Sequence, residues 1–67
     1  MNIQKLKAKM VELNYSVVDL AEEIGIGSAT LYAKLNGRSE FTYSELMNIK
    51  KALKMDRAEF EAILGVD

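Results

Sequence analysis

The sequence predicts an all-α domain of five short helices, and three observations lead to this fold class. Apolar residues recur at spacings of three and four along most of the chain, which is the period of an amphipathic helix. Three of these apolar stripes are preceded by a Ser, Thr or Asp with an acidic residue three positions later, the capping-box pattern that opens a helix. The sequence contains no proline, and no alternating apolar and polar run reaches the length of a strand.

The first predicted helix runs from the start of the chain to about residue 13 and ends near Asn14. The second begins at Ser16, whose hydroxyl can cap the backbone N–H of Asp19 three residues later. It ends at Gly25, which accepts a left-handed conformation. The apolar stripes of these two helices are Ile3, Leu6, Met10 and Leu13, and then Val17, Leu20, Ala21 and Ile24.

The third predicted helix spans about residues 28–35, where the Asn36-Gly37 pair ends it. The fourth and the fifth helix both open with a capping box. These boxes are Thr42 with Glu45 and Asp56 with Glu59, and the apolar faces behind them are Leu46, Ile49, Ala52 and Leu53, and then Phe60, Ile63 and Leu64.

Length and composition restrict what such a chain can do. The 67 residues leave room for one domain, residues 1–67, and the absence of cysteine and histidine removes disulfides and the commonest metal ligands. We therefore expect no cofactor, no metal and no small-molecule ligand. Lysines at positions 5, 7 and 9 interrupt any signal peptide, and no apolar run is long enough for a membrane span, so we expect a soluble, cytoplasmic protein.

The net charge of −1 and the pI near 5.4 do not by themselves indicate nucleic-acid binding. The distribution of charge is more informative than its sum. Residues 16–27 and 56–67 hold seven of the ten acidic residues, whereas eight of the nine basic residues lie outside these two segments. The acidic blocks leave positive surface elsewhere, so the charge pattern permits DNA binding.

The most informative segment is residues 17–37, in which two short helices meet at Gly25-Ile26-Gly27. Gly25 can take the positive φ that such a tight turn needs, and the small Ala21 lets the next helix cross closely. A turn of this kind joins helices at roughly 90–120°, so the second helix projects outward and can enter a major groove. The side chains expected inside this corner are Leu20, Ile24, Ile26 and Leu31.

Two segments, LAEEIGIGSATLYAKLNG and the later FTYSELMNIKKALKM, resemble the lambda-repressor-like, or XRE/Cro-CI, helix-turn-helix family. The resemblance covers about residues 3–64, and the second segment is similar to the final helices of phage repressors from Gram-positive hosts. It implies a sequence-specific regulator of transcription that binds double-stranded DNA, and the length favours a Cro-like repressor of a phage or prophage. The resemblance does not distinguish this role from that of an antitoxin-type autorepressor or a genomic regulator.

The resemblance also implies which residues bind DNA. The helix at about 28–35 would lie in the major groove, and the loop after it would grip phosphate. The expected base-reading residues are Ser28, Ala29, Thr30, Tyr32 and Ala33, and the expected backbone contacts are Ser16, Val17, Lys34, Asn36, Gly37 and Arg38.

Two positions depart from the family pattern. Lys34 stands where the family commonly has an apolar residue, and we expect its methylene stem to cover the core edge while its ammonium reaches outward. Val17 stands where a glutamine often touches the DNA backbone, so that contact would rely on Ser16 and the helix N-terminus. Phe41 and Tyr43 are expected to pack over the edge of the core.

The same residues also bear on two other classes of function. An enzyme is disfavoured because the carboxylates lie at helix starts and on exposed faces instead of converging, so we expect no catalytic residue. The alternative is a protein-interaction module with the same fold, an antirepressor or antitoxin-like partner. The acidic pI and Val17 favour that alternative, whereas the intact turn and Arg38 favour DNA.

A single recognition helix covers few base pairs, so we expect a homodimer, at least on DNA. The last helix leaves an apolar edge that could form its interface, although the same cluster could instead close the core of the monomer. The candidate interface residues are Phe60, Ile63, Leu64 and Val66.

Overall fold

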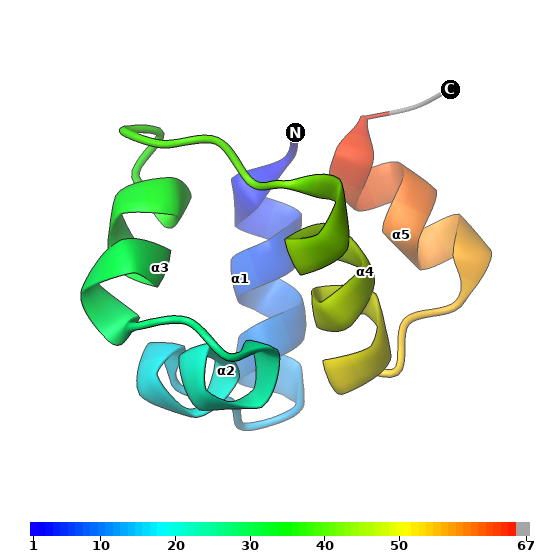
Figure 1. Ribbon diagram of the computed structural model, residues 1–67. Coiled ribbons are helices and arrows are strands. Elements are labelled where there is room, and N and C mark those ends of the chain that lie inside the picture. Colours follow the sequence, from blue (N-terminus) through cyan, green and yellow to red (C-terminus); the bar gives the residue numbers. More distant parts are fainter. Residues whose placement is uncertain (66–67) are drawn as a thin grey trace.

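The computed structural model describes residues 1–65, and within that range it contains five α-helices joined by short turns (Figure 1). The expected all-helical fold is confirmed, with helix bounds within one or two residues of those expected from the sequence. The helices are α1 (Ile3–Glu12), α2 (Val17–Ile24), α3 (Ser28–Leu35), α4 (Tyr43–Ala52) and α5 (Arg57–Leu64).

Helix starts follow the local signals in the sequence. The Ser16 hydroxyl accepts the Asp19 N–H at 3.0 Å, while the Ser16 N–H donates to Asp19 Oδ2 at 3.1 Å. The same reciprocal pattern opens α4 and α5, so all three expected capping boxes are confirmed. The structure adds one cap that the sequence analysis missed, because the side chain of Asn2 accepts the Lys5 N–H at 3.1 Å.

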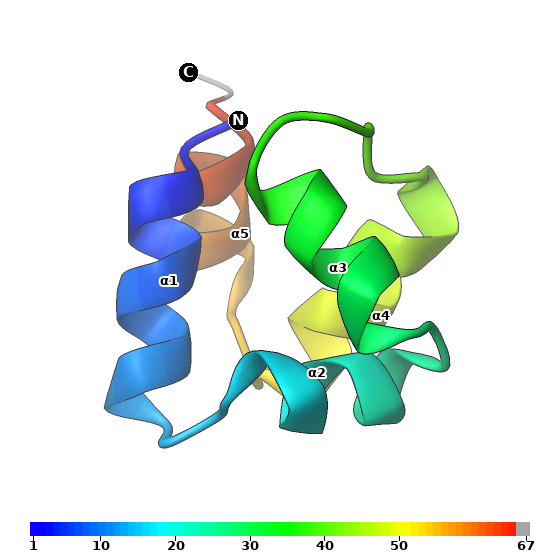
Figure 2. The ribbon, with the colours of Figure 1, turned by 90° about the vertical axis from the view of Figure 1, so that its left-hand side faces the viewer.

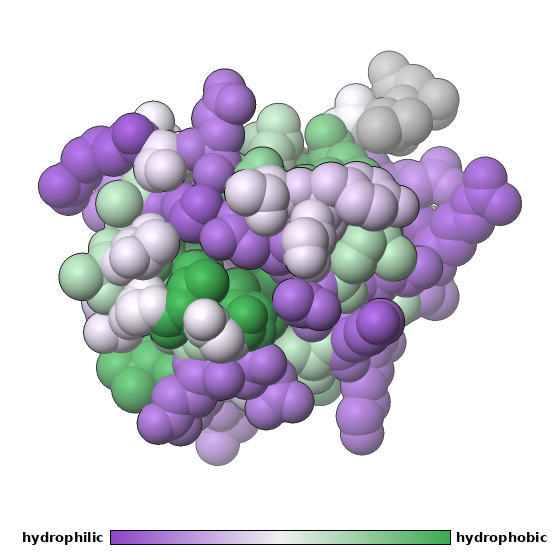
Figure 3. Space-filling view, in the orientation of Figure 1, coloured by the Kyte–Doolittle hydropathy of each residue, from purple (hydrophilic) through white to green (hydrophobic). Residues whose placement is uncertain are grey.

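A single core lies between the helices. Its five largest fully buried side chains come from α1 to α4 and from the residue that ends α4. On the face shown in Figure 3, hydrophilic and neutral side chains dominate, and strongly hydrophobic ones gather in a small area between α3 and α4. The fully buried residues are Leu6, Leu20, Leu31, Ile49 and Leu53.

The first and last helices pack side by side (Figure 2). The backbone N–H of Asn2 donates to the carbonyl oxygen of Ile63 at 2.6 Å, and Lys9 Nζ lies 2.7 Å from Glu59 Oε2. This packing buries Phe60 and Ile63, which are only 9% and 4% exposed.

The expectation that Phe60 and Ile63 form a dimer interface is therefore wrong, because both side chains fill the core of the monomer. Leu64 is half-buried and stays available in part, and Val66 lies outside the described residues. Phe41 packs against the core as expected, whereas Tyr43 is 76% exposed. Tyr43 is the first residue of α4 and projects into solvent.

No helix within the described part of the chain has the length and apolar character to cross a membrane.

Candidate nucleic-acid interface

The turn between α2 and α3 has the geometry that the sequence predicts. Gly25 ends α2 with φ +78° and ψ 31°, the left-handed conformation that glycine adopts without steric cost. The N–H of the next residue, Ile26, donates to the carbonyl oxygen of Ala21 at 3.0 Å, the bond that closes a Schellman-type helix end. Gly27 then caps α3 with an extended backbone, φ −70° and ψ 148°.

The inside of this corner is apolar and closed. Leu20 and Leu31 are fully buried, Ile24 is buried and Ile26 is partly buried. These side chains hold α3 against α2, so the opposite face of α3 is left to solvent. Figure 2 looks onto that side of the molecule, where α3 lies in front and α2 crosses below it.

Most of the residues expected to read bases lie on the outer face of α3. Tyr32 is 52% exposed, Ala29 and Thr30 are also exposed, and Ser28 and Ala33 are partly buried. No side chain caps the first turn of α3, so its backbone N–H groups face outward without a side-chain acceptor. This turn offers hydroxyls, a small apolar surface and free N–H groups, which suit base edges or phosphate.

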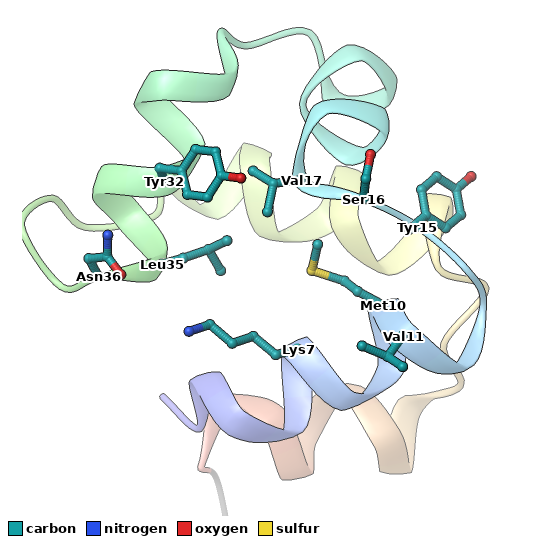
Figure 4. A pocket seen from close by; sticks show the side chains of 9 residues that line it. All are labelled: Lys7, Met10, Val11, Tyr15, Ser16, Val17, Tyr32, Leu35 and Asn36. Carbon is teal, nitrogen blue, oxygen red and sulfur yellow. The ribbon is translucent and has the colours of Figure 1, made fainter.

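A groove of about 320 Å³ runs beside α3 and collects residues from three helices (Figure 4). Tyr32 and Asn36 come from α3 and its end, and Ser16 and Val17 come from the start of α2. The structure thus brings together four of the residues expected to contact DNA. The side chain of Val17 is half-buried against the core. At this position, only the backbone at the start of α2 is then left to contact DNA.

The same groove is lined by Lys7 of α1, a residue that sequence reasoning missed. Its side chain is exposed and extends from α1 toward the end of α3 that carries Asn36 (Figure 4). A signal was present in the sequence, because Lys7 lies four residues after Ile3 and three before Met10. That spacing puts Lys7 at the edge of the apolar stripe that faces the rest of the domain.

The expectation that the ammonium of Lys34 reaches outward is wrong. Lys34 is 7% exposed, and its Nζ lies 2.8 Å from Glu45 Oε1 and 2.9 Å from the carbonyl oxygen of Glu40. The position lies three residues after Leu31 on the inner face of α3, so the stem enters the core edge. A charged group there needs partners, and the start of α4 supplies them. Lys34 is therefore not a phosphate contact.

The loop after α3 begins with a fixed turn. Gly37 has φ +78°, and the Arg38 N–H donates to the carbonyl oxygen of Ala33 at 2.9 Å. The Arg38 side chain is exposed and forms no ion pair with any residue that the structure describes. Asn36, Gly37 and Arg38 thus lie at the end of α3 with a cation free to meet an anion.

The shifted pKa values all belong to helix caps and ion pairs. The Ser16 backbone N–H and hydroxyl lower the pKa of Asp19, and the Lys34 ammonium, with the Thr42 N–H, lowers that of Glu45. Between α1 and α5, the Lys9 ammonium lowers the pKa of Glu59, whose carboxylate in turn raises that of Lys9. Residues 1–65 hold no group of three or more metal-ligating side chains. Each of these perturbations is accounted for by a helix cap or by an ion pair between two helices.

Comparison with known families agrees with this geometry. A family model described as a Cro/C1-type HTH DNA-binding domain matches residues 5–62, which include all five helices nearly complete. No curated protein and no solved structure matched the chain. Because the family match covers most of the sequence, the chain belongs to the Cro/C1-type helix-turn-helix DNA-binding domains.

Proposed function

We propose that this protein is a sequence-specific transcriptional regulator that binds double-stranded DNA as a Cro-like repressor, with α3 in the major groove. The observation that carries the proposal is the outward face of α3, which the closed corner with α2 holds away from the core. An α-helix held in this way fits the major groove, where its first residues meet base edges. The likeness of the final helices to phage repressors supports a phage or prophage origin.

In this proposal, base reading falls to the first turns of α3. The Ser28 and Thr30 hydroxyls can donate to or accept from base edges, and the Thr30 methyl and Ala29 suit a thymine methyl. Tyr32 and Ala33 follow on the same outer surface, and the exposed phenol of Tyr32 can reach a base or a sugar. The short side chains at residues 28–30 let the helix backbone approach the DNA closely.

Phosphate binding falls to the two sides of α3. Arg38, with Asn36 and Gly37, would meet the backbone after the end of α3, and Ser16 would meet it at the start of α2. Lys7 adds a second cation beside the groove that Ser16 shares with Asn36. Cations on both sides of one helix match the two phosphate strands that border a major groove.

Dimerisation is the third part of the proposal. Leu64 lines a mostly apolar groove of about 420 Å³, which is bordered by the start of the chain, by Lys34 and the loop after α3, and by α4. A second copy packing here would cover this surface, and helix-turn-helix dimers read two half-sites one helical turn apart. The groove's other apolar residues are Met1, Ile3, Phe41 and Leu46.

The test is binding to a mixed-sequence duplex at several salt concentrations, followed by selection of bound sites from a random duplex library. The proposal expects affinity to fall steeply with salt, by about 0.9 log units per log unit of salt for each phosphate neutralised. It also expects the selected sites to share a half-site repeated with two-fold symmetry. Binding that ignores salt, or selected sites with no common sequence, would favour the alternative of a protein-interaction module.

A further inference from the structure

Lys34 and Glu45 form the most buried ion pair within the described residues. The side chains are 7% and 16% exposed, and Nζ and Oε1 are 2.8 Å apart. Lys34 Nζ also donates to the carbonyl oxygen of Glu40 at 2.9 Å and lies 5.9 Å from the centre of the Phe41 ring. One ammonium therefore contacts three different residues beyond the end of α3.

The partner carboxylate is itself fixed in place. Glu45 is the third residue of α4, and its Oε1 accepts the Thr42 N–H at 2.8 Å in the capping box that opens the helix. The Glu45 N–H donates in return to Thr42 Oγ1 at 3.1 Å. The same carboxylate oxygen thus joins the α4 cap to the last turn of α3.

The segment between these helices carries the proposed phosphate contact, Arg38. At one end it leaves α3 through the fixed turn at Gly37. At the other end, Lys34 holds the carbonyl oxygen of Glu40. Residues 36–41 are therefore tied back to the recognition helix at both ends of the loop.

Stability alone does not account for a buried pair at this site. Removing two charges from water costs about as much as their attraction returns, so an apolar side chain of the same size would fill the space as well. The pair adds directional hydrogen bonds, because the ammonium holds one particular carbonyl oxygen and one particular carboxylate oxygen. Well-satisfied buried networks of this kind hold neighbouring elements in one arrangement.

We propose that Lys34 and Glu45 are a positioning pair for DNA binding. They hold the 36–41 loop so that Arg38 faces the phosphate beside the groove that α3 reads, although neither residue touches DNA. This inference rests on the proposed function and deepens it. It assigns a binding role to Glu45, whose negative charge would otherwise only oppose DNA.

The sign of that charge gives a sharp test with Glu45→Gln. Glutamine can still accept the Thr42 N–H, but it holds the Lys34 ammonium less firmly. Simple electrostatics predicts tighter binding to a duplex, because one negative charge is removed. The positioning role predicts binding about 3- to 10-fold weaker at constant salt, the effect of one misplaced charged hydrogen bond. The matched control is Glu23→Gln on α2, which removes the same charge from an exposed residue outside any described ion pair and should not weaken binding.

A double-mutant cycle tests whether the pair acts through Arg38. Lys34→Met keeps the apolar stem, and it should weaken binding and lower the salt slope by about one phosphate, as Arg38→Ala does. In the double variant, the two losses should not multiply, because both remove the same contact. Melting curves show whether each variant is folded. If Lys34→Met does not fold, the Glu45→Gln variant still tests the proposal.

Two results would overturn the proposal. One is a Glu45→Gln protein that binds as tightly as the wild type or more tightly. The other is a cycle in which the effects of Lys34→Met and Arg38→Ala multiply. Failure of the proposed function looks different, because the wild-type protein would then show no salt-dependent binding to DNA at all. In that case the pair is only a structural tie between α3 and α4.

Discussion

Gly25 and Gly27 stand on either side of Ile26, yet their backbones have opposite conformations, with φ +78° at Gly25 and −70° at Gly27. An added Cβ at Gly25 would meet no atom within 4 Å, and one at Gly27 would lie 3.8 Å from Thr30 Oγ1, an ordinary contact. Space is thus available at both positions. Only the left-handed backbone of Gly25 requires glycine.

The first prediction concerns this difference. Gly25→Val should lower the free energy of unfolding by about 1–2 kcal/mol or more, because a β-branched residue is strained at positive φ. Gly27→Ala is the matched control and should change it by no more than about 0.5 kcal/mol, because alanine caps less well than glycine but restricts the unfolded chain. Urea denaturation of the two variants measures both values. Equal losses would mean that the left-handed backbone of Gly25 does not account for its need of glycine.

The second prediction separates the two kinds of DNA contact. Arg38→Ala should weaken binding to every duplex and reduce the salt slope by roughly one unit, since it removes one phosphate contact. Thr30→Ala should leave the slope unchanged and relax the preference at one base pair, by about 1–3 kcal/mol at most. Titrations of matched and mismatched duplexes at several salt concentrations give both quantities. A change of base preference in Arg38→Ala with an unchanged slope would reverse the assignment.

A third prediction compares two exposed lysines of α1. Lys7 lines the groove beside α3, whereas Lys5 lines a different groove between α1 and α5. Lys7→Ala should therefore weaken duplex binding about 2- to 5-fold and reduce the salt slope, and Lys5→Ala should change both much less. The two variants lose the same charge, so a general effect of net charge would weaken both alike.

The fourth prediction concerns pH and Glu45. The Lys34 ammonium and the Thr42 N–H hold the pKa of Glu45 below its ordinary value of 4.5. A lowered pKa in the folded state means that the contribution to stability is fully present above pH 4.5 and is lost as pH falls through the lower folded value. Glu45→Gln should therefore destabilise the protein most above about pH 4.5, and the destabilisation should shrink as pH falls further below that value. A destabilisation that is constant over this range would show that the carboxylate charge has no part in the pair.

The fifth prediction tests the proposed dimer through Leu64. Leu64→Asp would place a charge in the apolar groove, so it should prevent two copies from assembling on a palindromic site while leaving the monomer folded. Sedimentation with and without the duplex gives the stoichiometry, and Leu13→Asp, at the exposed end of α1 and outside the groove beside α3, is the control. A one-to-one complex of the wild-type protein with the palindrome, well above the dissociation constant, would exclude the dimer.

Local features of this fold could be predicted from the sequence. A capping box needs only two residues three positions apart, so Ser16 with Asp19 indicated a helix start without any knowledge of the tertiary structure. Gly25 likewise indicated a left-handed turn, because the conformation depends on that residue alone. These signals determine the helix boundaries and the corner between α2 and α3.

Features that depend on helix packing could not be predicted in the same way. Lys34 and Glu45 are eleven residues apart across a loop, and no periodic pattern links them. The spacing of Lys7 places it beside the apolar stripe of α1, but whether that side of α1 faces α3 or α5 depends on how the helices pack. The burial of Phe60 and Ile63 depends on α1, at the other end of the chain.

The hydrogen bond between Asn2 and the carbonyl oxygen of Ile63 also bears on how the domain can be rebuilt. Because residues 2 and 63 lie this close, a short linker can join α5 to α1, and the chain can then be opened elsewhere as a circular permutant. The loop between α4 and α5 lies across the molecule from α3 (Figure 1), and the exposed Lys54 within this loop is a suitable new opening. A reporter fused at this opening would lie at a distance from the proposed DNA-binding face. In such a permutant α5 becomes the first helix, and α1 follows it through the linker.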